Sequence, residues 1–157
     1  MPRRKKDSRW NDIDGGSAFV IPYTLLRHEN FRRMSPFAVK LLTDLARQYS
    51  GFNNGYLCCA WTLMKDEGWR SETTVRAAML ELEHYRLIIR TRQGGKNLAN
   101  LHALTWRRID DKVDAPLEIQ PTVKPLDSWK EKVPDFERSS GERRAGKAGR
   151  KPLKAAA

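Results

Sequence analysis

The feature that most constrains the fold is the order of patterns in the middle of the chain. A short helical stretch leads to a glycine, a longer helical stretch follows, and two β-rich stretches come next: residues 60–67, Gly68, 72–85, 87–92 and 101–106. Glycine often ends a helix because it adopts a left-handed backbone at no steric cost. Two helices joined by a tight turn and followed by a hairpin predict an α+β fold with a helix-turn-helix.

The longer helix has a recognisable start and two distinct faces. Ser71 is a natural N-cap, because its hydroxyl can accept a hydrogen bond from a free amide of the first turn. One face is predicted to be buried, since apolar side chains recur there at helical spacing: Val75, Ala78, Met79, Leu82 and Tyr85. The other face carries Glu72, Thr73, Arg76 and Ala77. Arg76 is suited to guanine, and Thr73 or Ala77 to a thymine methyl, in a DNA major groove.

Two further elements are predicted upstream of this pair of helices. Ser35 and Pro36 begin a helix, and its apolar stripe is Ala38, Leu41, Leu42, Leu45 and Tyr49. Residues 56–58 are long enough for a minimal strand. In the short helix over residues 60–67, Leu63 and Met64 are expected to face the core.

The loop between the two β-rich stretches is predicted to be a flexible, basic tip. It reads Gln93-Gly94-Gly95-Lys96-Asn97 and follows Arg92. A hairpin of this kind can lie along the sugar–phosphate backbone, where basic side chains add affinity but little sequence information.

Length and charge indicate one domain with two basic ends. The chain has 157 residues and a net charge of +11. Residues 1–9 hold five Lys or Arg and one acid, and residues 138–157 hold seven and one. Basic ends are common in nucleic-acid-binding proteins, because Lys and Arg displace counterions from phosphates. The alternative is that these ends only keep the domain in solution.

Composition also bears on location. No apolar stretch approaches the ~20 residues that span a bilayer, and no secretory signal follows the basic start. Cys58 and Cys59 are adjacent and therefore make a poor disulfide pair. A cytoplasmic protein without a membrane segment is expected.

The predicted organisation is a disordered basic arm over residues 1–16, a folded domain over 17–110, and a flexible linker and basic tail over 111–157. The last segment is poor in apolar residues and carries five prolines, which argues against a packed core. Within it, four apolar residues share the spacing of one helical face: Leu126, Trp129, Val133 and Phe136. A segment that docks a partner protein is therefore an alternative to a plain linker.

Several short stretches resemble small winged helix-turn-helix proteins of bacterial phages, plasmids and integrated elements. They span about residues 19–108: Phe19-Val20-Ile21-Pro22, Leu42 to Tyr49, Asn53-Asn54-Gly55, Gly68-Trp69-Arg70-Ser71, Thr91 to Gly95, and Ala103-Leu104-Thr105-Trp106. These proteins are similar to the DNA-binding modules of replication or regulatory proteins. A departure is Tyr85-Arg86, where a small residue or glycine is usual before the first wing strand.

The resemblance implies which residues would meet DNA. The groove-facing residues would be Arg70, Ser71, Thr73, Thr74 and Arg76, and the wing residues Arg92, Lys96 and Asn97. It implies sequence-preferring binding of double-stranded DNA, as a transcriptional regulator or a replication-initiation factor of a mobile element.

No pattern for catalysis, a cofactor or a metal emerges, so the expected protein is not an enzyme. The spacing of Cys58, Cys59, His84 and His102 matches no familiar zinc site. The rival to DNA binding is a winged-helix module that docks a replication or repair protein. The near-even charge of residues 71–85 keeps it open, since Glu72, Glu81 and Glu83 stand against Arg76.

Overall fold

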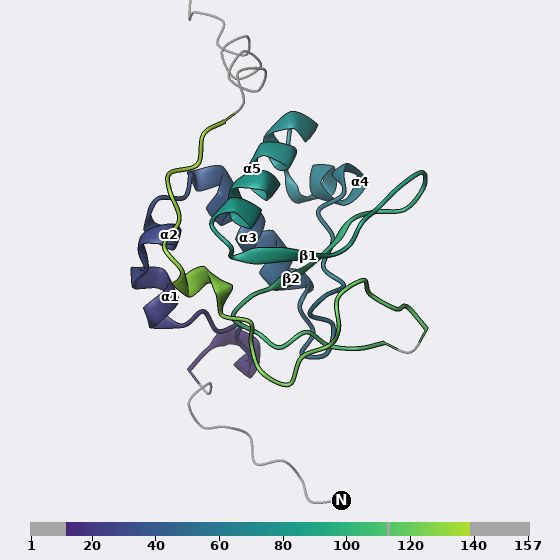
Figure 1. Ribbon diagram of the computed structural model, residues 1–157, viewed down its shortest axis with the longest axis horizontal. Coiled ribbons are helices and arrows are strands. Elements are labelled where there is room, and N and C mark those ends of the chain that lie inside the picture. The colour runs from purple at the N-terminus through teal and green to yellow at the C-terminus, as the bar shows by residue number, and fades with distance from the viewer. Residues whose placement is uncertain (1–11, 113, 139–157) are drawn as a thin grey trace, which may run out of the picture.

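The computed structural model describes residues 12–112 and 114–138, which form an α+β fold (Figure 1). The α-helices are α1 (Tyr23–Arg27), α2 (Glu29–Arg32), α3 (Pro36–Gln48), α4 (Trp61–Met64) and α5 (Glu72–His84). The strands are β1 (Ile88–Arg92) and β2 (Leu101–Leu104), and the 3-10 turns are η2 (Asp14–Gly16), η3 (Lys65–Glu67) and η4 (Ser128–Lys130).

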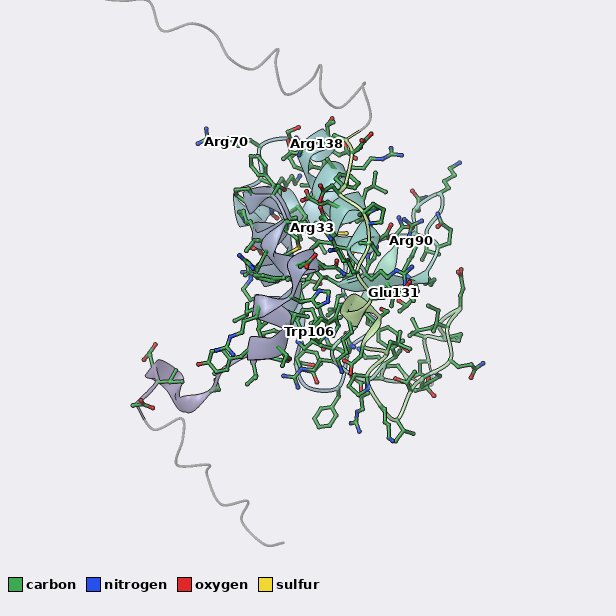
Figure 2. The ribbon with its side chains drawn as sticks, turned by 60° about the vertical axis from the view of Figure 1, so that its left-hand side comes forward. Arg33, Arg70, Arg90, Trp106, Glu131 and Arg138 are labelled. Carbon is green, nitrogen blue, oxygen red and sulfur yellow. The ribbon has the colours of Figure 1, made fainter. Side chains whose placement is uncertain are left out.

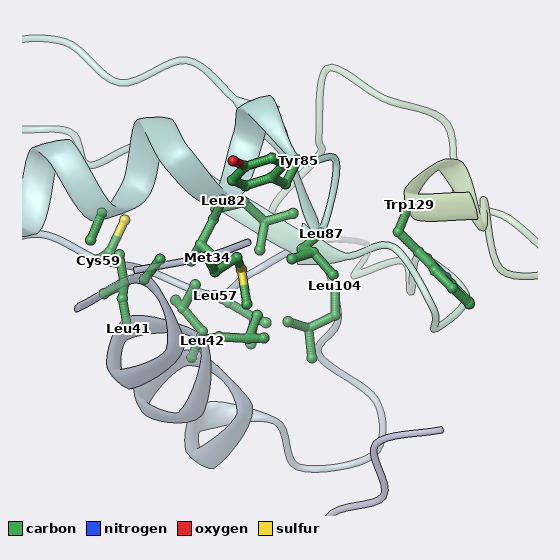
Figure 3. Packing of buried hydrophobic residues seen from close by; sticks show 14 of the residues in the cluster. Met34, Leu41, Leu42, Leu57, Cys59, Leu82, Tyr85, Leu87, Leu104 and Trp129 are labelled. Atoms are coloured by element: carbon green, nitrogen blue, oxygen red, sulfur yellow. The ribbon is translucent and has the colours of Figure 1, made fainter. Parts of the chain in front are cut away.

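The core lies between α3 and α5, and both helices begin where the sequence predicts. Ser35 Oγ accepts a hydrogen bond from the Ala38 amide at 3.2 Å, and Ser71 Oγ accepts one from the Thr74 amide at 3.3 Å. The apolar stripes of the two helices face each other (Figure 3). Each large apolar side chain buried in this way stabilises the fold by roughly 1.5–3 kcal/mol.

Helix α4 is shorter than predicted and continues as the 3-10 turn η3, which ends at Gly68 with φ +82°. Met64 is buried, as expected, but the expectation for Leu63 was wrong, since 48% of its surface is exposed. Consecutive side chains on a helix point about 100° apart, so a helix of one turn presents only one of these two to the core.

The two strands form an antiparallel hairpin that packs beside α5. Ile88 lies opposite Leu104, and a bulge falls between Arg90 and Arg92. On the other side of β2, Leu57 forms an isolated antiparallel bridge with His102, with hydrogen bonds of 3.1 and 2.8 Å. The minimal strand predicted over residues 56–58 is thus a single paired residue.

The unusual Arg86 marks the turn between α5 and β1. Its φ of +58° is left-handed, the region in which glycine would be favoured. The turn is closed by hydrogen bonds from the Arg86 amide to Glu83 O and from the Leu87 amide to Leu82 O, the pattern of a Schellman motif. Thr105 Oγ1 also donates to Arg86 O at 2.8 Å. The chain therefore makes the expected turn without the expected glycine.

Residues 117–138, here called the strap, differ most from the prediction. A flexible linker was expected, but Trp129 and Val133 are only 3% and 8% exposed and belong to the core cluster. The strap bonds to the hairpin region through the amide of Glu118 with Thr91 O and the amide of Asp127 with Thr105 O. Its prolines do not prevent packing, because an extended segment needs no helical hydrogen-bond ladder.

Trp129 was also considered as an anchor for a partner protein, and this alternative is wrong for its side chain. Trp129 lies in η4 rather than in a longer helix. Its ring packs edge-on against the ring of His28, with 5.4 Å between the ring centroids. Of this apolar face, Trp129 and Val133 are buried in the domain and Phe136 is partly buried, while 39% of the surface of Leu126 is exposed. The predictions for residues 1–11 and 139–157 lie outside the described residues.

Candidate nucleic-acid interface

The exposed surface at the start of α5 brings together most of the predicted groove residues. Arg70, Thr73 and Arg76 are exposed, and Arg70 stands at one end of the molecule (Figure 2). Neither arginine forms an ion pair with another described residue. Ser71 and Thr74 are half-buried, and Ser71 Oγ is occupied by the cap. The side chains available to a ligand are therefore fewer than the sequence implied.

Ala77 is a correction. It was assigned to the outer face as a contact for a thymine methyl, yet it is only 2% exposed. Ala77 lies one turn before Glu81, whose carboxylate accepts hydrogen bonds from Ser35 at the start of α3. This face of α5 is thus turned toward α3, and Ala77 cannot reach a DNA base.

The acidic residues of α5 are mostly internal. Glu81 is 4% exposed and accepts from the Ser35 amide at 2.6 Å and the Ser35 hydroxyl at 2.7 Å. Glu83 accepts two hydrogen bonds from Arg90 Nη2, at 3.0 and 3.1 Å, and one from His102 at 3.1 Å. Of the three glutamates that balanced Arg76 in the sequence, Glu72 is exposed, Glu83 is half-buried and Glu81 is buried.

The environment of Glu83 favours its ionised form. Burial by itself would raise the pKa of this carboxyl, but the hydrogen bond from His102 and the charge of Arg90 outweigh burial. The pKa of Glu83 therefore lies below its ordinary value of 4.5. The carboxylate holds β1 and β2 against α5 through these two partners, so it orients the hairpin relative to the helix.

Cys59 closes this buried chain of polar groups and is chemically quiet. Its Sγ lies 3.7 Å from Nδ1 of His102, which is fully buried. Burial raises the pKa of the Cys59 thiol to about 12, so it stays protonated rather than becoming a nucleophilic thiolate. Within residues 12–112 and 114–138, no group of three or more His, Cys, Asp or Glu is placed to hold a metal ion.

The hairpin tip is closed by hydrogen bonds between its own residues. Gly95 and Leu98 exchange hydrogen bonds of 2.9 and 3.1 Å, and the Gly94 amide donates to Asn100 Oδ1 at 2.6 Å. Asn97, with φ +61°, makes the turn and is exposed together with Lys96. These internal bonds give the tip a defined shape.

Arg92 is less available than the two tip residues. It is half-buried, its Nη2 lies 3.5 Å from Ala99 O, and its Nε is buried with no hydrogen-bond partner among the described residues. Its position at the stem suits a supporting role for the tip more than direct contact with a ligand.

A hollow of about 370 Å³ separates α5 from the hairpin. Its lining includes Glu72 and Arg76 of α5, Arg90 of β1, and Gln93 and Asn100 of the hairpin loop. Arg76 lines this hollow on the α5 side, and Arg90, which is paired with Glu83, lines it on the hairpin side.

Sequence reasoning missed the residues that support this surface. Glu81, Glu83 and Asn100 do so through their hydrogen bonds. No local pattern signals the role of Glu81, because its partner Ser35 lies 46 positions earlier. For Asn100, the Gly94-Gly95 pair in the sequence indicated a turn nearby, and Gly94 is the residue that donates to Asn100 Oδ1.

Comparison with known proteins adds no identity. No family model matches the chain, and neither a curated protein nor a solved structure matches it. No helix in the part of the chain that the structure describes has the length and apolar character needed to cross a membrane.

Proposed function

We propose that this protein is a winged helix-turn-helix protein that binds double-stranded DNA with a sequence preference. Helix α5 would enter the major groove, and the β1–β2 hairpin would act as the wing on the adjacent backbone. The order of elements supports this assignment, from α3 through the Leu57 bridge, α4, the Gly68 turn and α5 to the hairpin.

The observation that carries the proposal is the outer face of α5. Thr73 and Arg76 are exposed there, while Glu81 and Glu83 are engaged inside the domain. An exposed guanidinium on a helix can donate two hydrogen bonds to guanine, and a short neighbour allows the helix to approach the bases closely. Arg70 and Lys96 add positive charge on either side, where phosphates would lie.

The same observations weaken the rival function of docking a replication or repair protein. That reading depended on the even charge of α5 and on an available Trp129. Glu81 is buried against Ser35, the charge of Glu83 is paired with Arg90, and Trp129 is buried. A role in transcription or in replication initiation on a mobile element fits the proposed binding equally well.

The test is selection of preferred duplexes from a random library, followed by fluorescence anisotropy with the full chain at two salt concentrations. Arg76→Ala should cost about 1–3 kcal/mol on the preferred duplex and much less on unrelated duplexes. Lys96→Ala should weaken all duplexes about equally. Arg32→Ala is the matched control, because Arg32 is an exposed arginine on α2.

Two results would contradict the proposal. Absence of duplex binding by the full chain at low salt would contradict the proposed DNA-binding function. Equal losses of affinity from Arg76→Ala on every duplex would contradict recognition of bases by α5.

A further inference from the structure

A second hollow lies at the C-terminal end of α3. Its volume is about 710 Å³, and its walls come from three parts of the chain: residues 17–19, residues 46–52, and Arg107 after β2. Pockets for small organic ligands commonly measure about 300–1,000 Å³. Figure 2 shows Arg70 at one end of the molecule and Trp106, the residue before Arg107, well away from it. This hollow, here called the Arg107 hollow, is therefore separate from the proposed reading face.

The Arg107 guanidinium packs against two aromatic rings that line the hollow. Its Cζ lies 5.3 Å from the ring centroid of Phe19 and 4.9 Å from that of Tyr49. The two rings meet edge-on, with 5.8 Å between their centroids. Attraction between a cation and a ring face holds the guanidinium in place but accepts none of the hydrogen bonds that its edge can donate.

The donors of Arg107 are not used within the described part of the chain in the way a buried guanidinium requires. Its Nε is buried and has no hydrogen-bond partner among the described residues, and no described carboxylate forms an ion pair with it. The Nε1 of Trp106, which packs against the same Phe19 ring, is also buried without a described partner. A buried donor of this kind costs stability, so an acceptor from outside the chain would bind favourably there.

The rim of the hollow is held in a fixed shape after α3. Asn53 Nδ2 donates to Gln48 O at 2.8 Å, and Asn53 Oδ1 accepts from the Ser50 amide at 2.7 Å. The Tyr49 hydroxyl donates to Gly51 O at 3.1 Å. The carbonyl groups at a helix C-terminus normally disfavour an anion, but those of residues 48 and 51 are already bonded inside the rim.

Two exposed side chains of the hollow offer a second charge and an aromatic ring. Arg47 lines it and keeps 59% of its side chain exposed while it pairs with Glu67. Phe52 also lines it, and 71% of its surface is exposed. An exposed phenyl ring can stack on a flat ring of a ligand. The hollow thus combines guanidinium groups for an anion with an available ring.

We propose that the Arg107 hollow binds a nucleoside monophosphate, with the phosphate at Arg107 and Arg47 and the base against Phe52. A phosphate offers several acceptor oxygens, and a guanidinium binds two of them at once. The same chemistry is presented by a free nucleotide and by the 5′-phosphorylated end of a nucleic-acid strand. The proposal does not depend on duplex binding by α5.

The first test measures binding of adenosine 5′-monophosphate to the full chain by isothermal titration calorimetry, without DNA. Arg107→Gln should lower the affinity about tenfold or more, because the charged donors of the phosphate are lost. Arg32→Gln is the matched control, since Arg32 is exposed on α2 and does not line the hollow. Attraction of the nucleotide to the basic ends is common to both variants, so their difference reports on the hollow.

The second test examines recognition of the base and does not depend on the folding of an Arg107 variant. Phe52→Ala should lower the affinity for adenosine 5′-monophosphate about fivefold or more, because a stacking partner is removed, and should leave the weaker binding of inorganic phosphate unchanged. Tyr23→Ala is the control, because Tyr23 is 77% exposed and lies outside the hollow.

A 5′-phosphorylated pentanucleotide distinguishes the two sources of the ligand. Tighter binding of the pentanucleotide than of the mononucleotide, with the same dependence on Arg107 and Phe52, identifies a strand end; equal or weaker binding identifies a free nucleotide.

Three results would overturn the proposal. These are no saturable binding of either probe, equal affinities for Arg107→Gln and Arg32→Gln, and equal affinities for Phe52→Ala and Tyr23→Ala. Because none of these measurements uses a duplex, they leave the proposed function of α5 untouched, and failure of duplex binding leaves the Arg107 hollow untouched.

Discussion

The hairpin tip and the strap are both irregular segments, yet they are held in opposite ways. The tip is closed by bonds between near neighbours, Gly95 with Leu98 and Gly94 with Asn100. The strap is held by partners distant in the chain, up to about a hundred positions away in the bonds of Asn30 to Trp129 and Glu131. The residues of a local turn can be recognised in the sequence, whereas a buried hydrogen-bond partner far along the chain cannot.

The two segments also differ in what they contribute to stability. The tip exposes Lys96 and Asn97, and 49% of the surface of Leu98 is exposed as well. The strap adds Trp129 and Val133 to the core. We therefore expect changes in the strap to affect the free energy of unfolding most, and changes in the tip to affect the shape of the proposed DNA-binding surface.

The largest effect is expected from Trp129→Ala. Removing a nearly fully buried tryptophan should lower the free energy of unfolding by about 3–5 kcal/mol, because it deletes apolar contacts and leaves a cavity. Urea denaturation measures this loss. Val123→Ala is the control from the same segment, since Val123 is 92% exposed, and it should stay within about 0.5 kcal/mol of the wild type. Similar small losses for both variants would mean that the strap is not part of the core.

A smaller loss is expected from Gly94→Ala at the tip. A Cβ at this position would come within 2.4 Å of Leu98 O and 2.7 Å of the Asn100 amide nitrogen, so the backbone must shift. The expected cost is about 1–3 kcal/mol, as in other overpacked sites. Gly95→Ala is the matched control, because its Cβ would meet nothing within 4 Å. If both variants unfold at the same urea concentration, the tip is not held as described.

The next prediction concerns Arg86, which lies in the turn before β1 and forms an ion pair with Glu131 of the strap. Arg86→Gly should be more stable than Arg86→Ala by about 1 kcal/mol, because glycine adopts the left-handed backbone without a steric penalty. Both variants lose the ion pair with Glu131, so their difference in thermal or urea stability isolates the backbone conformation. An alanine variant equal to or better than the glycine variant would contradict a left-handed residue here.

The smallest effect is a pH dependence at Glu83. Because its pKa is lowered in the fold, its ionised form stabilises the protein above the ordinary value of about 4.5. This contribution is lost as the pH falls through the lower pKa of the folded state. The stability difference between the wild type and Glu83→Gln should therefore shrink on acidification below pH ~4.5. A stability difference that grows on acidification would contradict a lowered pKa of Glu83 in the folded protein.

Much of the α3–α5 pair could be predicted from sequence, because caps and apolar spacing are local signals. The N-caps Ser35 and Ser71 and the left-handed Gly68 are confirmed. The predictions for Leu63 and Ala77 failed at the edges of the apolar stripes. Helical spacing predicts the direction of a buried face but not its width, and on α5 the buried face extends as far as Ala77.

The candidate site was only partly readable for the same reason. Exposed Arg70, Thr73 and Arg76 follow from their place on the helix, as Lys96 and Asn97 follow from their place in a loop. The internal use of the α5 glutamates depends on partners elsewhere in the chain, so counting charges along the sequence overestimated the acidity of this face.

By itself, the sequence determined the local elements of this protein: where its main helices begin, where the chain turns, and which residue types are offered at the start of α5. Capping, glycine conformation and apolar spacing act within a few residues, so they can be read from the order of residues alone. Only the tertiary structure decided that Glu81 is buried, that Glu83 is half-buried and paired with Arg90, and that Trp129 belongs to the core. These outcomes depend on hydrogen bonds and burial between segments far apart in the chain, and such contacts exist only once the fold has brought the segments together.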